Sequence, residues 1–359
     1  MVETANLNRK KVDGVTNKEP LYTPEDIPAV ITQTEGNPYH EWFTVVPGVR
    51  AYFQEAGHVL GSALVTLELI EGEEKKILGF TGDLGRQGLP IIRDPEQLTN
   101  LDYLIAEGTY GDREHDDFQS SYIDLAKIIN ETYARGGKVI IPSFALERAQ
   151  ELLYIIHELI NAKAIPPKFV YVDSPLTVQI SELFADYPNL VDKETKETFY
   201  SQNKDPFIFT TLRFVESPAD SKRLNNIKEP CIIISASGMC EFGRIRHHLK
   251  NTLGDSRNTI IIVGFMAENT LGRRLLEGVK EVNILNAHLQ VRARIEVLNS
   301  LSAHADGQDL VNFINNAGKL KKLFLVHGEE GALTALANNV KSAEIGEVIV
   351  AEKGVVYKL

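Results

Sequence analysis

Cysteine, long apolar runs and positive charge are what this sequence has little of. Its 359 residues include two cysteines, Cys231 and Cys240, too few for a disulfide framework or a cysteine-rich zinc site. No apolar run approaches the roughly 18 residues that a membrane span requires, and the polar residues 1–11 do not resemble a signal peptide. We therefore expect a cytoplasmic protein that does not enter a membrane.

The shortage of positive charge bears on possible partners. The formal net charge is −11, which does not favour indiscriminate binding to nucleic acid. A polyanionic substrate would need a local basic groove or a metal ion to offset this field. The length allows about two or three domains of an ordinary globular protein.

The chain changes its pattern along its length. Residues 1 to about 40 are polar and predict an irregular segment punctuated by prolines. A β-rich part follows, with strands expected over 42–55, 64–68, 77–80 and 101–107. From residue 119 on, short apolar strands alternate with amphipathic helices, which indicates a parallel sheet covered on both faces.

The alternating part comprises helices expected at 119–135, 145–161, 243–252 and 270–278, and strands at 138–142, 168–173, 230–235 and 258–264. Paired strands are expected again over 281–300. The end of the chain predicts helices at 307–317 and 332–342, and strands at 323–326, 346–351 and 355–358. This order predicts an α/β fold in which one domain is interrupted by another.

Two strong metal ligands stand at the ends of strand-like runs. His58 lies in Ala56-Gly-His-Val-Leu-Gly-Ser-Ala63 and Asp83 ends Phe80-Thr-Gly-Asp83. A hairpin formed by the two intervening strands would bring both side chains to one space. An imidazole and a carboxylate there suit zinc or manganese. A buried histidine and a turn aspartate are the alternative.

Three further polar residues occupy the same kind of position. His304 lies in Leu301-Ser-Ala-His-Ala-Asp306, His327 in Leu325-Val-His-Gly-Glu329, and Glu107 ends another apolar run. Sites in α/β proteins gather at such strand ends. The remaining histidines outside residues 243–250 have no partner pattern, which predicts surface or packing roles for His40, His115, His157 and His288.

A second feature is the small-residue loop Ser235-Ala-Ser-Gly-Met239, which follows a buried strand and precedes a helix opening at Gly243-Arg244. Free backbone N–H groups and a helix start form an anion site in outline. The candidate phosphate-binding residues are Ser235, Ser237, Gly238, Arg244, His247 and Arg273. An ordinary strand–loop–helix turn with surface arginines is the alternative.

These motifs together resemble the metallo-β-lactamase/β-CASP RNA-processing nucleases. The resemblance lies in the ordered motifs around His58, Asp83, Glu107, His304 and His327, and it covers nearly the whole chain. The Ser-Ala-Ser-Gly-Met loop, Gly-Arg-Ile-Arg-His-His-Leu and Asn-Thr-Leu-Gly-Arg-Arg are similar to bacterial members. The resemblance implies a metallo-β-lactamase αββα sandwich interrupted by an inserted β-CASP α/β domain with a mainly parallel sheet.

The resemblance also implies roles. His58 would ligate the first of two Zn²⁺ ions, Asp83 would bridge both, and His327 would complete the second. Glu107 would orient His304, and His304 would donate a proton to the leaving oxygen. The substrate would be RNA, bound in a groove under the inserted domain.

One motif of the family is missing from this sequence. Members carry a His-x-His-x-Asp-His cluster upstream of the His58 motif, whereas His40 is the only histidine before His58 here. The stretches Asn8–Lys11 and Glu19–Thr23 resemble the linker that follows that cluster. We therefore expect residues 1–111 to be the remainder of the metallo-β-lactamase domain, 112–282 the β-CASP domain, and 283–359 the return to the first domain.

The missing cluster leaves several interpretations. The chain is the C-terminal part of a ribonuclease whose N-terminal fragment is separately encoded or lost, and it is weak or inactive alone. Otherwise it is a metal-free RNA-binding protein, or a remnant without activity. A hydrolase of small molecules with the metallo-β-lactamase fold is a further alternative. The sequence carries no signal for an oligomeric state.

Overall fold

The computed structural model describes residues 22–202, 205–340 and 344–359. The chain divides into two compact units, Met1–Pro38 and Tyr39–Leu359. In the first, the 3-10 helix η1 (Pro24–Asp26) precedes helix α2 (Ile27–Gln33), so the prediction of an irregular segment is wrong here. Both elements carry a proline in the first turn, where its missing N–H is not needed. The linker-like stretch Asn8–Lys11 lies outside the described residues.

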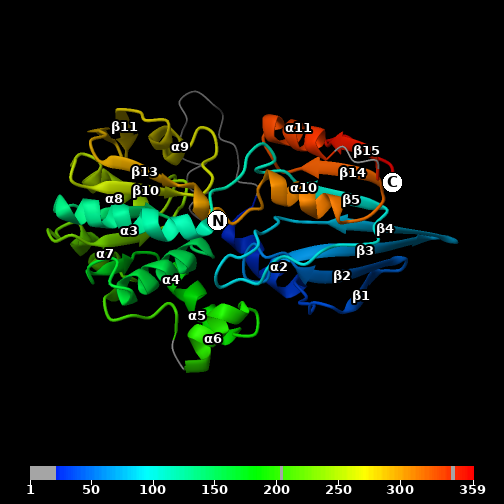
Figure 1. Cartoon of the computed structure of the whole chain (residues 1–359), viewed down its shortest axis with the longest axis horizontal. Helices are drawn as coiled ribbons and strands as arrows, with labels where there is room; N and C mark the ends of the chain where they lie inside the picture. Colours follow the sequence, from blue (N-terminus) through cyan, green and yellow to red (C-terminus); the bar gives the residue numbers. More distant parts are fainter. Residues whose placement is uncertain (1–21, 203–204, 341–343) are drawn as a thin grey trace. The chain divides into compact units, whose positions relative to one another are not determined.

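The second unit contains a seven-stranded mixed sheet in the order β1-β2-β3-β4-β5-β14-β15 (Figure 1). Its first four strands are antiparallel neighbours, and β4, β5, β14 and β15 pair in parallel. The strands are β1 (Trp42–Val46), β2 (Val49–Glu55), β3 (Ala63–Glu71), β4 (Glu74–Phe80), β5 (Tyr103–Glu107), β14 (Leu320–Val326) and β15 (Ile345–Val350).

The predicted hairpin is the central part of this sheet. Strands β3 and β4 pair from Val65 with Phe80 to Glu71 with Glu74, so both are longer than predicted. The two-residue turn between them contains Gly72 with a φ of +62°, a conformation that glycine adopts without strain. The hairpin thereby sends β2 and β4 in the same direction, and their ends reach the same edge of the sheet.

A six-stranded sheet, all of whose strands are parallel, forms the other large layer of this unit, in the order β13-β10-β6-β9-β7-β8. A separate hairpin pairs β11 with β12. The strands are β6 (Val139–Pro142), β7 (Val170–Val172), β8 (Leu212–Phe214), β9 (Ile232–Ser235), β10 (Thr259–Val263), β11 (Glu281–Ile284), β12 (Ala287–Gln290) and β13 (Arg294–Leu298).

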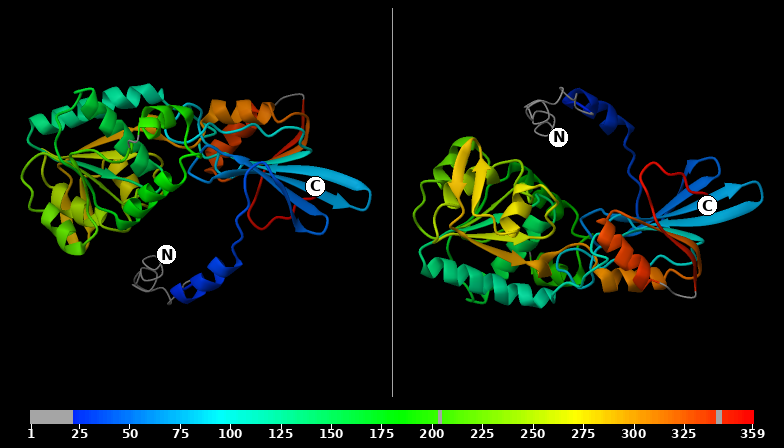
Figure 2. Two further views of the ribbon diagram at one scale, coloured as in Figure 1. Left: turned by 90° about the horizontal axis from the view of Figure 1, so that it is seen from below. Right: turned by 90° about the horizontal axis from the view of Figure 1, so that it is seen from above.

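Successive residues of these strands enter opposite cores. Ile141 and Ile234 belong to one apolar cluster, whereas Ile140 and Ile233 belong to the cluster on the other face. Because both faces are covered, the strands are continuously apolar rather than alternating. Figure 2 shows helices on both faces of this sheet.

The helices of the parallel-sheet layer divide between the two cores. The first core includes buried side chains of α3 and α4, and the second those of α8 and α9. The elements are α3 (Phe118–Ala134), α4 (Arg148–Asn161), α5 (Pro175–Asp186), α6 (Lys193–Thr198), η2 (Tyr200–Gln202), α7 (Pro218–Leu224), α8 (Ile245–Thr252) and α9 (Leu271–Leu276).

Helices α10 (Gly307–Asn315) and α11 (Glu330–Asn339) cover one face of the seven-stranded sheet after the turn η3 (Asn299–Leu301). Leu310 and Leu333 of these helices share a core with Leu104 and Leu323 of the strands. In the described residues, the seven-stranded sheet is thus covered by α10 and α11 on one of its faces. No helix in the described part of the chain has the length and apolar character to cross a membrane.

Two sequence predictions at the end of the chain differ from the structure. Residues 355–358 do not form a strand; instead, the ring of Tyr357 packs 5.5 Å from that of Phe324. Strand β13, within the predicted returning part 283–359, pairs with β10 of the parallel sheet. Its alternating sequence did not indicate which sheet it joins. The three domain boundaries stay predictions.

Candidate metal centre

The candidate site lies where neighbouring strands end. Phe80 of β4 pairs with Ile105 of β5, and Glu107 of β5 pairs with Val326 of β14. Since the three strands are parallel, their carboxyl ends meet at one edge of the sheet, which is where α/β sites form. Asp83, Glu107 and His327 follow or end these strands, so they come together although they are far apart in sequence.

His58 and His304 reach the same edge through loop contacts. The turn after β2 carries His58, and its Ala56 carbonyl accepts a hydrogen bond of 2.8 Å from the Gly85 N–H. Gly85 also forms an isolated β-bridge with His304. A Cβ atom at position 85 would lie 1.8 Å from the Gly57 carbonyl oxygen, so only glycine allows this close approach. One residue therefore holds three parts of the site together.

Asp83 lies between two imidazoles. Its Oδ2 is 3.9 Å from His58 Nε2, and its Oδ1 is 3.5 Å from His327 Nε2. These separations exceed ordinary hydrogen bonds but are close to the ~3.4 Å expected between two ligand atoms of one tetrahedral zinc. The described residues thus fit a metal, with one carboxylate oxygen for each histidine.

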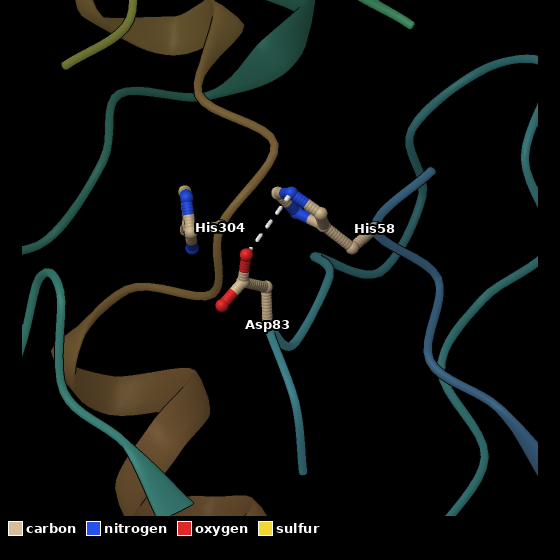
Figure 3. Close-up of side chains that lie close together, drawn as sticks. All are labelled: His58, Asp83 and His304. Atoms are coloured by element: carbon tan, nitrogen blue, oxygen red, sulfur yellow. Dashed lines mark ion pairs between the residues drawn. The ribbon is translucent and has the colours of Figure 1, made fainter. Parts of the chain in front are cut away.

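His304 joins the same group. Potential ligand atoms of His58, Asp83 and His304 all lie within 4.8 Å of one another, and Figure 3 shows the three side chains side by side. The rings of His58 and His304 are 4.5 Å apart, and those of His304 and His327 are 6.3 Å apart. His304 is therefore placed to serve the chemistry of this centre, as a proton donor or as a ligand.

Glu107 fixes the orientation of His304. The buried Glu107 carboxylate lies 3.0 and 3.2 Å from His304 Nδ1, and it also accepts hydrogen bonds from the Leu84 and Thr109 N–H groups. Burial opposes protonation of His304, but the hydrogen bond and the charge of Glu107 outweigh it and raise the pKa of His304. The Nδ1 contact leaves Nε2 as the nitrogen free for chemistry.

The electrostatics of His58 differ from those of His304. Burial, and then the neighbouring His304, lower the pKa of His58 to about 4. The neutral imidazole, which is the form that binds metals, is therefore favoured at neutral pH. The pKa values of two histidines in one site are thus shifted in opposite directions.

These side chains open onto a cleft of about 550 Å³. The seven-stranded side contributes His58, His304, His327 and Glu329. Loops at the carboxyl ends of β6, β9 and β10 contribute Phe144, Leu146, Met239 and Phe265, and the first residue of α4 contributes Arg148. Arg148 is the only lysine or arginine among the described residues that line the cleft.

Two of the predicted phosphate-binding residues belong to a buried network. Ser235 donates to the Asp173 carbonyl oxygen, and Arg244 Nη1 lies 2.7 Å from Asp173 Oδ1. Arg244 also donates to the Val215 and Glu216 carbonyls. His248 Nε2 lies 2.6 Å from the other Asp173 oxygen. Both residues are engaged with Asp173, and neither lines the cleft.

The other four predicted residues also lie outside the cleft lining. The Ser237 hydroxyl accepts from the Phe242 N–H at 3.2 Å, and Arg273 is paired with Glu277 at 2.7 Å. His247 is exposed on α8. A Cβ at position 238 would lie 2.9 Å from the Phe144 ring, so Gly238 lets its loop pack against the cleft wall. Roles in RNA binding stay predictions for all six.

Sequence reasoning missed the cleft residues Phe144 and Arg148. The rule that selected Ser235, a position just after a buried strand, also applies after the strand predicted over 138–142. Nothing in the sequence indicated which of the two loops faces the metal centre. The Asp173–His248 pair was missed because its members are 75 positions apart.

Comparisons with known proteins agree with this arrangement. Residues 149–275 match the Beta-Casp domain, and residues 288–351 match the Zn-dependent metallo-hydrolase RNA specificity domain. The ribonuclease TTHA0252 of Thermus thermophilus is 35% identical over 320 residues, which cover 89% of this chain and 71% of that protein.

Two relatives from Methanocaldococcus jannaschii extend the comparison. An RNase J-like protein is 35% identical over 319 residues, covering 87% of this chain and 72% of the relative. The transcription termination factor FttA is 31% identical over 335 residues, covering 90% of this chain and 52% of that factor. The chain thus spans about half the length of the termination factor.

The match to the Zn-dependent metallo-hydrolase RNA specificity domain and the similarity to a ribonuclease place this chain in a class of metal-dependent RNA hydrolases. More particularly, the chain belongs to the metallo-β-lactamase/β-CASP family of RNA-processing nucleases. The predicted resemblance is thereby confirmed at the level of the family.

Proposed function

We propose that this chain forms the greater part of a zinc-dependent ribonuclease that hydrolyses phosphodiester bonds during RNA processing or decay in the cytoplasm. One observation carries the proposal. The two oxygens of Asp83 face His58 and His327, while the His304–Glu107 pair stands beside them. This combination provides metal ligands and a proton donor in one cleft.

The residues divide the work as follows. His58, Asp83 and His327 hold the metal, with Asp83 between the two histidines. Bound zinc would supply Lewis-acid chemistry that offsets phosphodiester charge and activates water near neutral pH. Glu107 keeps His304 oriented through its Nδ1 contact and favours its protonation, and His304 delivers a proton to the leaving oxygen.

The donor set also indicates what the active form requires. A catalytic zinc usually has three protein ligands, whereas the proposed ligands of two ions number three in all. We propose that a His-x-His-x-Asp-His segment outside these 359 residues completes the centre. These residues alone should then bind zinc weakly and cleave RNA slowly.

Two measurements test the proposal together. Zinc bound per chain is measured after dialysis against buffered trace zinc, and cleavage of end-labelled single-stranded RNA is followed with and without the complementing segment. We expect less than one zinc per chain alone, and cleavage that appears with the segment and disappears in EDTA. Asp83→Ala should abolish it, and His304→Ala should slow it by about 10²- to 10⁴-fold.

His288→Ala is the matched control, because His288 is an exposed histidine paired with Glu281 outside the cleft. It should leave zinc content and cleavage unchanged. About two zinc ions per isolated chain, lowered by His327→Ala, would contradict the need for a further segment. Cleavage that survives EDTA or Asp83→Ala would overturn the proposed function itself.

A further inference from the structure

The wall of the cleft opposite the metal centre is apolar and exposed. Phe144 is 47% exposed and Leu146 36% exposed, and both follow β6. Met239 and Phe265, which follow the neighbouring strands β9 and β10, complete the wall. Large apolar side chains at the mouth of a cleft commonly mark a binding surface.

The wall is held rigidly and adjoins the catalytic histidines. The Phe144 ring packs so closely on Gly238 that a Cβ there would lie 2.9 Å from it. The Phe265 ring meets the Tyr110 ring edge-on at 6.2 Å, and Tyr110 lies 6.1 Å from the His304 ring. A continuous series of rings therefore connects the apolar wall to the proposed proton donor.

A single arginine provides the positive charge on this side of the cleft. Arg148 is 6% exposed, and its Nη1 is bound by the buried Glu151. A guanidinium has five N–H donors in a planar fork that matches phosphate oxygens, and Glu151 is bound through Nη1 alone. The net charge of this chain is −11, so most of its surface does not attract anions. An arginine beside an aromatic wall favours binding of an anion that also carries a flat apolar group.

We propose that Phe144 and Arg148 form a nucleotide subsite of the cleft, in which the base stacks on Phe144 and the adjoining phosphate binds Arg148. The inference rests on the proposed function for the identity of the ligand, single-stranded RNA. Every base has a flat aromatic face, so the subsite accepts any of the four bases. Its task is to hold one nucleotide beside the metal centre rather than to read sequence.

Binding of a fluorescently labelled single-stranded RNA hexamer, measured by anisotropy in EDTA, tests the subsite without requiring catalysis. Phe144→Leu keeps an apolar side chain but removes the ring, and we expect Kd to rise by about 5- to 100-fold. Phe144→Trp should retain most of the affinity. Neither change should alter the slope of log Kd against log salt concentration, because no charge is lost.

The arginine is tested in a variant that removes both members of the hydrogen-bonded pair, Arg148→Gln with Glu151→Gln, so that Glu151 is not left charged without Arg148. We expect weaker binding and a salt slope shallower by about 0.7, the value for one phosphate contact of a single strand. A general loss of packing would weaken binding without changing this slope.

Two matched controls lie outside the cleft. Phe169, immediately before β7, is 46% exposed, so Phe169→Leu repeats the loss of an exposed ring. Arg257, exposed and paired with Asp255, is replaced by Gln. Both controls should bind RNA as the unaltered chain does. Equal losses in Phe169→Leu and Phe144→Leu, or an unaltered chain that does not bind the hexamer, would overturn the subsite.

The two proposals can fail separately. If the chain binds RNA through Phe144 and Arg148 but the zinc-loaded, complemented protein does not cleave it, the proposed function fails and the subsite stands. If the complemented protein cleaves RNA and Phe144→Leu changes neither Kd nor KM, the subsite alone is wrong.

Discussion

Glu107 shows how one buried carboxylate organises a site. It receives hydrogen bonds from Leu84, from Thr109 and from His304, which belong to three different segments of the chain. Burial disfavours its charge, but these contacts outweigh burial and lower the pKa of Glu107. The carboxylate is therefore charged at neutral pH and acts on the imidazole beside it.

Glu107→Gln should change the pH dependence of cleavage by the complemented enzyme. Glu107 raises the pKa of His304 against the effect of burial, so removing its charge lowers that pKa. In the proposed function the protonated His304 is the acid, so the alkaline limb of the pH–rate profile should move to lower pH, and the rate should fall by about 10- to 100-fold.

The exposed pair Glu281–His288, with atoms 3.0 Å apart, offers a matched substitution, Glu281→Gln, that should leave the profile in place. An alkaline limb that does not move in Glu107→Gln would show that Glu107 does not set the protonation of His304.

Asp173 is a buried carboxylate of the parallel-sheet layer that, like Glu107, contacts several hydrogen-bonding partners. Burial opposes its charge, but hydrogen bonds from His248, Ser221 and Arg244 outweigh it and lower the pKa of Asp173 below the usual 3.8. The stabilisation from its charge is therefore present above about pH 4 and is lost as the pH falls through the lowered pKa.

Asp173→Asn should reduce the free energy of unfolding by about 3 kcal/mol at pH 7, and the difference from the unaltered chain should shrink below pH 4. Denaturant unfolding at several pH values measures both. Asp255→Asn, in an exposed pair with Arg257, should have little effect. A difference that stays constant between pH 7 and pH 3 would contradict the assigned role of the charge.

At the scale of elements, the loop after β4 depends on Gly85. Gly85→Ala places a Cβ 1.8 Å from the Gly57 carbonyl and should separate the Asp83 loop from the His58 turn. We expect about 1–3 kcal/mol of destabilisation and loss of the zinc that the complemented protein binds. Gly254→Ala is the control, because nothing lies within 4 Å of a Cβ there. Unchanged zinc binding in Gly85→Ala would refute this account.

Many helices and strands were predictable from the local pattern of apolar residues. Strands β6, β9 and β10 and helices α3 and α4 lie close to their predicted ranges. A strand buried on both faces has a continuous apolar run, and a helix buried on one face has apolar residues at the helical period. Residues of β13 were predicted to form a strand, but the pairing of this strand with β10 was not predicted. An alternating pattern is the same whichever sheet the strand joins. The helix α2 was missed because Pro28 and the prolines before and after the helix suggested a loop.

At the scale of the molecule, the charge distribution predicts selectivity between nucleic acids. The net charge of −11 disfavours a polyanion in general, whereas the cleft offers Arg148 and three histidines to a single nucleotide. Single-stranded RNA can place one nucleotide there, whereas a duplex keeps its bases stacked. We expect anisotropy at about 0.15 M salt to detect binding of a single-stranded hexamer and not of random duplex DNA. Equal affinity for both would contradict this expectation.

The site was predictable only in part, because some of its residues carry local sequence signals and others depend on how distant parts of the chain are arranged. His58, Asp83, Glu107, His304 and His327 carry local signals, because each stands at a strand end beside small residues, and the structure brings all five together. Phe144 and Arg148 have no such mark, since their function follows from which loop faces the cleft. That depends on how the two sheets are placed, which no local pattern records.

The pairing of β5 with β14 also determines when the site can form. Thr109 donates to the His327 carbonyl across 218 positions of chain, and nearly all the chain between them builds the parallel-sheet layer. Contacts of such long range close slowly and late during folding. Regained zinc affinity should therefore lag behind helix formation when the unfolded protein is returned to native conditions, which makes metal binding a reporter of completed folding.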